Sequence, residues 1–216
     1  HYQCIKVPEG VSVVMVAPSG PGVMVRSLFK SGKGIPTLVA VEIDYGDALK
    51  TALSYSKAIG GTMACAFLST FREETETDLY GEQVILTGII PKSIKESFKV
   101  LLEDGYNPIV AWFVCFYEVK NIVDMMSEQG LSDMFDAVSD TAAYGGLTRG
   151  NRLINESTKH EMVSILNEIK SGMFHREWNQ EAKEGLKKLS KMKKKDSSDK
   201  IFDDITKSIL PKLKED

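Results

Sequence analysis

Three carboxylates at helical spacing are the residues that most clearly point to chemistry. Glu74, Asp78 and Glu82 lie four residues apart in the segment FREETETDLYGEQ, so a helix would carry all three on one face. Like charges at this spacing destabilise a helix by about 0.2–0.5 kcal/mol per pair, and Gly81 adds about 1 kcal/mol relative to alanine. A bound cation would offset the repulsion, and oxygen ligands without a nearby His or Cys favour Mg²⁺ over zinc. The alternative interpretation is a solvated acidic face that Lys or Arg elsewhere balances.

A second candidate is Glu118, which interrupts the largely apolar segment AWFVCFYEVKNIVDMM at 111–126. A carboxylate on a buried helix needs a positive partner, a proton or a metal, whereas a partly exposed or ion-paired glutamate needs none. Ser139, in the segment VSDTA, is on spacing grounds a helix N-cap. The three histidines are scattered and form none of the patterns typical of nucleophilic catalysis.

Two kinds of secondary structure are expected to position these residues. Val11–Ala17, Thr37–Ile43 and Thr62–Thr70 read as buried strands separated by helical segments, which is the pattern of a parallel sheet. After residue 70 the pattern is helical, with helices expected at about 72–86, 92–104, 107–128, 131–144, 156–172, 176–192 and 200–210. The sequence therefore predicts a mainly α fold with an α/β N-terminal portion, namely the end of a doubly wound parallel sheet followed by an all-helical domain.

Composition narrows the classes of function. The chain has 216 residues, a net charge of −3 and 43% hydrophobic residues, which argues against disorder. Its lysines concentrate towards the C-terminus, where the cluster at 187–195 is expected to solvate a helix, and the remaining acidic body argues against a nucleic-acid partner. The longest apolar run, Ile109–Tyr117, is too short to cross a membrane. Three scattered cysteines and no secretory pattern in the first ten residues predict a cytoplasmic protein.

Six segments together resemble ketol-acid reductoisomerase in its short-chain form. They are MVAPSGPG (15–22), AIGGT (58–62), TFREETETDLYGEQ (70–83), YEVKNIVDMM (117–126), SDTAAYG (139–145) and GMFHREW (172–178). The resemblance runs in order to about residue 178, and its acidic segment is highly specific. It implies that residues 1–69 are the C-terminal remnant of an α/β dinucleotide-binding domain. Residues 70–192 would be a helical domain that intertwines with a second copy in a homodimer, and 193–216 a charged amphipathic tail.

The resemblance also implies an activity and a set of site residues. The family is an NADP-dependent oxidoreductase and isomerase that converts the small molecules 2-acetolactate or 2-aceto-2-hydroxybutyrate to 2,3-dihydroxy acids in branched-chain amino-acid (valine, leucine and isoleucine) biosynthesis. It uses Mg²⁺ and NADPH. The implied catalytic residues are Glu74, Asp78, Glu82 and Glu118, of which Asp78 and Glu82 ligate metal and Glu118 does so from the partner subunit. Ser139 would bind the substrate carboxylate.

Three departures from the family pattern bear on activity. The sequence contains no G-x-G-x-x-G, so its cofactor contacts are expected only at the turn formed by Pro18, Ser19 and Gly20. Ser19 stands where the family has an active-site lysine. Val114 stands where the family has a glutamate four residues before Glu118, which predicts weaker binding of a second metal ion. The alternative is a catalytically impaired paralogue or fragment that keeps only the dimerising helical domain and one weak Mg²⁺ site.

Overall fold

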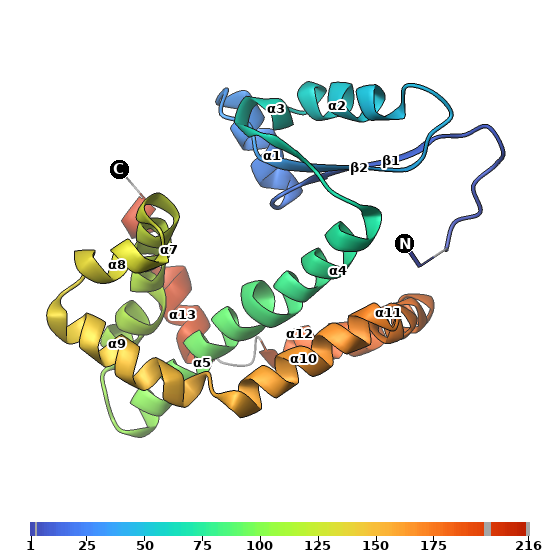
Figure 1. Ribbon diagram of the computed structural model, residues 1–216. Coiled ribbons are helices and arrows are strands. Elements are labelled where there is room, and N and C mark those ends of the chain that lie inside the picture. The colour runs from blue at the N-terminus through green and yellow to red at the C-terminus, as the bar shows by residue number, and fades with distance from the viewer. Residues whose placement is uncertain (3, 197–199, 215–216) are drawn as a thin grey trace. The chain divides into compact units, whose positions relative to one another are not determined.

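The computed structural model describes residues 1–2, 4–196 and 200–214 (Figure 1). The chain divides into two compact units, His1–Gly81 and Glu82–Asp216. The first unit contains a small sheet with helices, and the second is helical. This confirms the predicted fold class, mainly α with an α/β N-terminal portion. The division falls after Gly81, whereas the sequence placed it at residue 69.

The first unit contains a three-stranded sheet in the order β1-β2-β3, formed by β1 (Val13–Pro18), β2 (Thr37–Ile43) and β3 (Ala66–Leu68). β2 and β3 are parallel, but β1 and β2 are antiparallel, so the expectation of an all-parallel sheet is wrong for β1. The connection between the two strands runs through α1 (Gly22–Lys30). The Ser19 amide donates to the Pro36 carbonyl at 2.8 Å, which continues the antiparallel ladder one step beyond the Pro18–Thr37 pair. The apolar pattern of a buried strand is the same for either direction, so the sequence pattern does not specify it.

A buried polar pair fixes the helix that covers this sheet. α2 (Ala48–Ala58) packs on β1 and β2 and runs along one face of the sheet (Figure 1). The hydroxyls of Thr37 and Ser56 lie 2.8 Å apart and both residues are fully buried. The short helix α3 (Gly61–Ala64) occupies part of the region predicted as a strand. A Cβ on Gly61 would lie 2.5 Å from side-chain atoms of both residues of the pair, so only glycine fits there.

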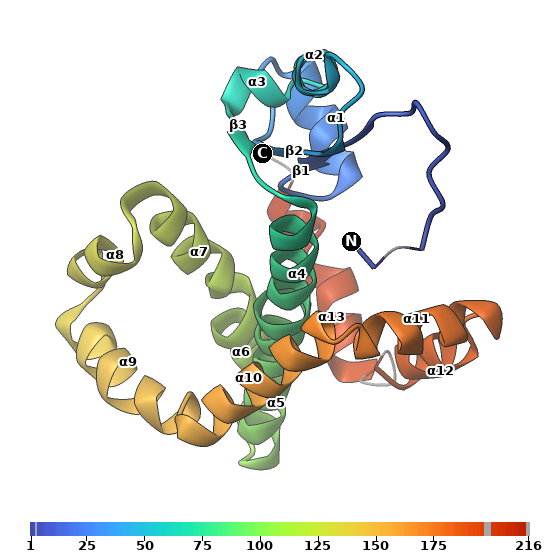
Figure 2. The same ribbon diagram turned by 45° about the vertical axis from the view of Figure 1, so that its right-hand side comes forward.

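The helical unit contains more elements than the sequence predicted. After α4 (Phe71–Gly81) closes the first unit, the second comprises η1 (Glu82–Ile89), α5 (Ile90–Glu103), α6 (Pro108–Trp112), η2 (Phe113–Tyr117), α7 (Glu118–Gln129), α8 (Leu131–Ala137), α9 (Asp140–Leu153), α10 (Glu156–Lys170), α11 (Met173–Lys183), α12 (Lys187–Asp196), α13 (Lys200–Ile209) and the short η3 (Lys212–Lys214). The helix predicted at 131–144 is in fact two, because Val138 is extended and breaks it. η1 and η2 are π-helices, which the sequence pattern does not predict. Figure 2 shows α7 to α10 following one another along an open curve.

The core of the helical unit joins segments far apart in the sequence. Phe98 of α5, Trp112 of α6 and Phe202 of α13 are buried together, with the rings of Phe98 and Phe202 in edge contact at 5.1 Å. The Trp112 indole N–H donates to the Thr206 hydroxyl at 2.8 Å. α13 thus packs as part of this unit, although the sequence placed residues 193–216 in a separate tail. Within the described residues, no helix is long and apolar enough to span a membrane.

Candidate metal and substrate site

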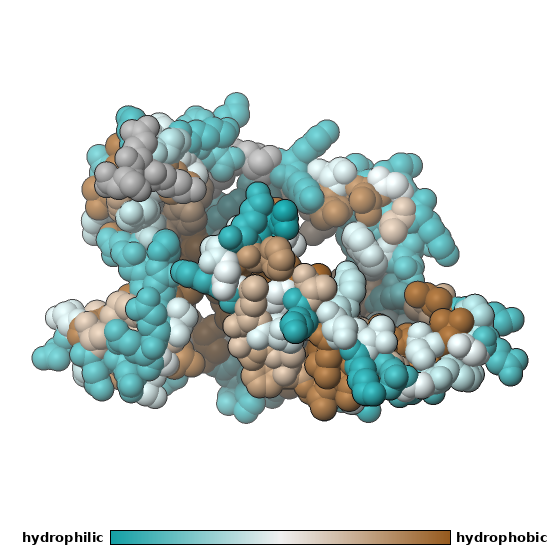
Figure 3. Space-filling view, turned by 90° about the horizontal axis from the view of Figure 1, so that it is seen from above, coloured by the Kyte–Doolittle hydropathy of each residue, from teal (hydrophilic) through white to brown (hydrophobic). Residues whose placement is uncertain are grey.

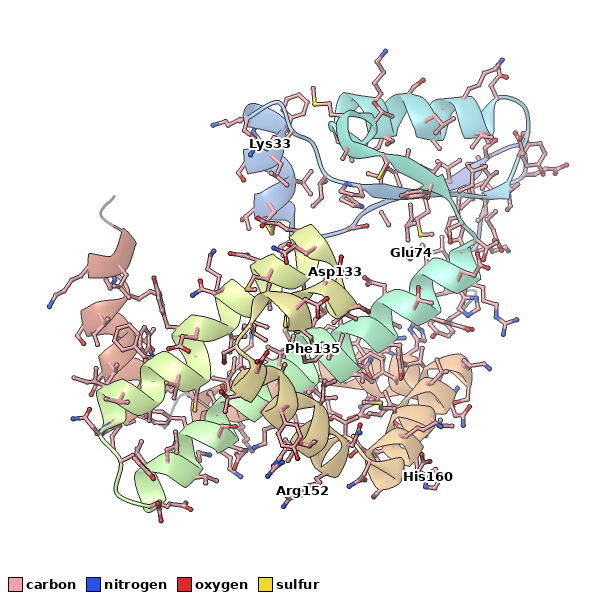
Figure 4. All side chains as sticks on the ribbon, turned by 60° about the vertical axis from the view of Figure 1, so that its left-hand side comes forward. Lys33, Glu74, Asp133, Phe135, Arg152 and His160 are labelled. Carbon is pink, nitrogen blue, oxygen red and sulfur yellow. The ribbon has the colours of Figure 1, made fainter. Side chains whose placement is uncertain are left out.

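α4 carries Glu74 and Asp78, the first two of the three carboxylates at four-residue spacing, which we call the acidic stripe (Glu74, Asp78 and Glu82). The helix begins where the Thr70 hydroxyl accepts a hydrogen bond from the Glu73 amide at 3.0 Å, and the acidic residues of its first turn favour the positive end of the helix dipole. Glu74 is half-buried on this helix (Figure 4). Burial, and secondarily the negative charge of Asp78, raise the pKa of the Glu74 carboxyl. Both effects disfavour a bare carboxylate, and a bound cation would reverse both.

A neighbouring acidic residue on α4 has a different environment. Glu76 lies off the stripe and accepts hydrogen bonds from His1 Nε2 at 3.1 Å and from Arg72 Nε at 3.3 Å. α4 therefore carries two kinds of acidic residue: Glu76, which has basic partners, and the pair Glu74 and Asp78, whose negative charges repel each other. Sequence reasoning did not single out Glu76, because one of its partners lies 75 residues away.

Glu82 is the first residue of the π-helix η1. The Thr87 hydroxyl donates to the Glu82 carbonyl at 2.7 Å, across the five-residue interval that defines a π-turn. Gly88 permits this geometry, because a Cβ at Gly88 would overlap the carbonyl oxygen of Gln83. π-turns occur frequently at functional sites, and the sequence pattern did not predict this one.

Glu118 follows directly after the second π-helix, η2, and its side chain is exposed. It borders a groove of about 590 Å³ whose other lining residues are apolar, among them Val114, Val119, Ile122 and Met126. Val114 lies one turn before Glu118 and is about half exposed. This face of the helix therefore offers a single carboxylate.

Ser139 is the N-cap of α9, as the sequence predicted. Its hydroxyl accepts a hydrogen bond from the Ala142 amide at 3.3 Å, and the residue is exposed. Because the capping bond uses the hydroxyl only as an acceptor, the hydroxyl hydrogen can still be donated to a carboxylate.

The turn after β1, formed by Pro18, Ser19 and Gly20, is fixed by a backbone hydrogen bond and by the close approach of Gly20 to Ile35. Pro18 ends β1, Ser19 is exposed, and its amide binds the Pro36 carbonyl. A Cβ on Gly20 would lie 2.8 Å from Ile35 Cδ1. The turn therefore has a defined shape and presents the Ser19 side chain outward.

The described residues do not assemble a complete metal site by themselves. No three His, Cys, Asp or Glu side chains among them are grouped so that they could hold a metal ion. Glu74 and Asp78 are close enough to influence each other, whereas no larger group joins them to Glu82 or Glu118. The donor chemistry is carboxylate oxygen throughout, which fits a hard divalent cation such as Mg²⁺.

Comparison with known proteins gives consistent matches along the chain. Residues 71–207 match the profile described as "Ketol-acid reductoisomerase, C-terminal domain", and residues 1–65 match "Acetohydroxy acid isomeroreductase, NADPH-binding domain". The chain is 50% identical over 198 residues to the ketol-acid reductoisomerase (NADP(+)) of Methanothermobacter thermautotrophicus, covering 91% of this chain and 60% of that protein. It is 49% identical over 195 residues to the enzyme of the same name from Methanocaldococcus jannaschii, covering 90% and 59%.

A solved structure of an NADH-preferring ketol-acid reductoisomerase from an uncultured archaeon is also similar. It superposes with a TM-score of 0.92 at 36% identity, covering 98% of this chain and 64% of that one. The chain thus spans about 60% of the length of the curated relatives it matches.

Proposed function

This chain belongs to the ketol-acid reductoisomerase family, and from that premise we propose that it carries the acidic, substrate-binding part of such an enzyme. The reaction would convert 2-acetolactate or 2-aceto-2-hydroxybutyrate to a 2,3-dihydroxy acid with NADPH, in branched-chain amino-acid biosynthesis. The observation that carries this proposal is the match of residues 71–207 to the family's C-terminal domain, together with the pair Glu74 and Asp78 on α4, where burial and the charge of Asp78 raise the pKa of Glu74. A carboxylate pair in that state favours a cation, as the reaction requires.

The roles follow from the donor atoms. Asp78 and Glu82 would hold Mg²⁺, and Glu74 would support them through its charge. When bound, Mg²⁺ would polarise the substrate's oxygens and stabilise the charge that shifts during alkyl migration. The exposed hydroxyl of Ser139 would donate to the substrate carboxylate, and its capping bond would hold it in place. Glu118 would complete the site from a second copy of the chain.

A second copy is supported by the exposed apolar surface of the helical unit. Leu131, Tyr144, Leu147 and Leu153 are each more than half exposed on α8 and α9. Figure 3 shows hydrophobic residues at several places on one face of the chain, among hydrophilic ones. Exposed apolar side chains on consecutive helices are typical of an interaction site, and we propose a homodimer through them. A complete ligand set would then form only in the dimer, which accounts for its absence within the described part of one chain.

The NADPH-binding role is proposed for the first unit. Residues 1–65 match an NADPH-binding domain, and the turn at Pro18, Ser19 and Gly20 would approach the cofactor with the exposed Ser19 hydroxyl. The amides of Ser19 and Gly20 already donate to the Pro36 and Pro18 carbonyls, and proline has no amide N–H. Ser19 supplies no positive charge there. No disulfide joins the described cysteines, which supports a reducing compartment such as the cytoplasm.

NADPH oxidation with 2-acetolactate and Mg²⁺ tests the activity. We expect Asp78→Asn and Glu82→Gln to abolish turnover, while Glu73→Gln, an exposed position on α4 outside the stripe, retains it. Calorimetric titration should detect one weak Mg²⁺ site that Asp78→Asn removes, because Val114 provides no ligand. Turnover that survives Asp78→Asn would refute the proposed site, and two tight Mg²⁺ sites would contradict the role given to Val114.

Mixing two inactive variants tests the partner's contribution. If Glu118 acts across the dimer, a heterodimer of Asp78→Asn and Glu118→Gln chains contains one intact site, and activity should return. If both residues act within one chain, every site in the mixture is broken and none returns. Failure to recover activity, with heterodimers shown to form, would place Glu118 within its own subunit.

A further inference from the structure

A largely apolar groove separates η1 from α10 in the helical unit. Its volume is about 440 Å³, and Figure 2 shows α10 crossing beside the helix that continues into α5. Val84 and Ile89 of η1 line one side, and Met162 and Ile165 of α10 line the other. Among the described residues that line it, none belongs to the metal, substrate, cofactor or dimer contacts proposed above. The proposed function therefore leaves this groove unexplained.

Gln83, the second residue of η1, also lines the groove and carries a buried donor without a partner. Its side-chain Nε2 is shielded from solvent, and no atom of the described residues accepts a hydrogen bond from it. Within the described part of the chain, no other buried side-chain nitrogen or oxygen lacks a partner. A buried N–H without an acceptor costs folding free energy, so this one indicates an acceptor that comes from outside the chain.

The hydroxyls that line the groove have already donated their hydrogens elsewhere. The Thr87 hydroxyl donates to the Glu82 carbonyl at 2.7 Å, and the Thr158 hydroxyl donates to the Leu153 carbonyl at 3.1 Å. Among the described lining residues, the carboxamide of Gln83 is thus the buried donor that remains for a ligand. The last torsion of a glutamine side chain is broad, so a rotation of this carboxamide would turn its N–H towards a molecule in the groove.

We propose that this groove binds a small uncharged molecule that has an apolar body and a carbonyl oxygen, and that Gln83 donates a hydrogen bond to this oxygen. The valine, isoleucine and methionine side chains of the lining would bury the apolar body. The volume lies in the range of about 300–1,000 Å³ found for small-molecule sites, which combine an apolar lining with a few orienting polar groups. The proposal does not depend on the reaction proposed above.

An uncharged carbonyl compound fits better than an anion or a water molecule. The described lining contains one ammonium, Lys92, and one carboxylate, Glu161, so it has no net charge with which to attract an ion. Lys92 is moreover paired with Glu96 at 2.8 Å. A single water could accept from the Gln83 amide but would leave the apolar sides of the groove in contact with solvent, whereas a ligand with an apolar body covers both.

NMR titration of the isotope-labelled chain with benzylacetone, an uncharged aromatic ketone, tests the proposal. We expect a dissociation constant on the order of 1 mM for a ligand of this size, and the side-chain amide signal of Gln83 should move as the ketone binds. Gln83→Met keeps the length of the side chain and removes the donor, so it should weaken binding about fivefold. The matched control is Gln129→Met at the exposed end of α7, which should change binding less than twofold.

Two further measurements separate the alternatives. Gln83→Met removes an unpaired buried N–H, so it should unfold at a higher temperature than the unaltered chain, which also shows that weaker binding is not a loss of the fold. Phenylbutyrate carries a carboxylate in place of the ketone, and it should bind more weakly than benzylacetone because the lining has no net charge.

Four results would overturn the proposal. The first is a Gln83 amide signal that does not respond to benzylacetone. The second is equal affinity of Gln83→Met and the unaltered chain, which would show that the donor takes no part. The third is tighter binding of phenylbutyrate, which would assign the groove to an anion. The fourth is ketone binding that appears only after dilution to monomers, which would assign the groove to a second copy of the chain.

Discussion

Replacing Gly88 by alanine tests whether η1 needs a residue without a side chain. The added Cβ would overlap the carbonyl oxygen of Gln83 and lie 3.0 Å from its carbonyl carbon. Both neighbours are backbone atoms of the same π-helix, so no side-chain rotation can relieve the contact. The π-turn must open or convert to an α-turn, which would move the part of the chain after Glu82.

The magnitude follows from two opposed effects. Overpacking a site that cannot relax costs about 1–3 kcal/mol, while alanine in an open helix interior gains up to about 1 kcal/mol over glycine. Gly145 of α9 is the matched control, because nothing lies within 4 Å of a Cβ built there. We expect Gly88→Ala to lower, and Gly145→Ala to raise, the free energy of unfolding. The difference of about 2–4 kcal/mol corresponds to roughly 10 °C in melting temperature.

Tryptophan fluorescence during urea or thermal unfolding measures this difference. Both tryptophans of the chain, Trp112 and Trp178, lie in the second unit, so the signal reports the unit that contains both glycines. Magnesium affinity should also fall in Gly88→Ala and stay unchanged in Gly145→Ala, because Glu82 begins the altered turn. Equal stability of the two variants would refute the reasoning, since it would show that Gly88 accommodates a side chain.

Three further predictions concern the acidic stripe, the core and the α9 cap. The pKa of the Glu74 carboxyl is higher in the folded chain than in the unfolded chain, so the unfolded chain loses the Glu74 proton at a lower pH. The contribution of Glu74 to the free energy of unfolding should therefore fall as the pH rises from the ordinary pKa to the raised one. Asp78→Asn should lessen that fall and should lower the pKa of Glu74 in an NMR titration. Thr206→Val leaves the buried indole N–H of Trp112 without its acceptor and should cost about 1–3 kcal/mol in urea unfolding. Ser139→Ala should cost about 1 kcal/mol and raise the KM for the hydroxy-acid substrate, whereas Ser139→Thr keeps the cap and should preserve both.

Features set by short-range rules could be predicted from the sequence. The helix that carries Glu74 and Asp78 was expected from the helical pattern of the residues after 70, and the cap at Ser139 depends on an amide only three residues away. Both features depend on residues close together in the chain, so neighbouring residues are sufficient to specify them.

Features that depend on residues far apart in the chain could not be predicted from the sequence. The β-branched pattern of β1 is the same for either strand direction, and the bond from Ser19 to Pro36 that closes the loop is invisible in that pattern. The amphipathic pattern of α13 predicts an apolar face, but Phe202 packs on Phe98, about a hundred residues earlier. A local pattern shows that such a face exists and not which segment covers it.

The sequence identifies Glu82 and Glu118 as candidate ligands but does not predict the directions of their side chains, and the two π-helices explain why. An α-helix turns a side chain by about 100° per residue, so inserting one residue into a turn redirects the side chains after it. Glu82 begins η1 and Glu118 comes directly after η2, so each lies at the boundary of such an insertion. The π-helix η1 is only eight residues long, so it changes the spacing of the apolar residues too little for the sequence pattern to reveal it. Because η1 excludes any side chain at Gly88, the direction that it gives to the chain after Glu82 is a specific feature of this fold.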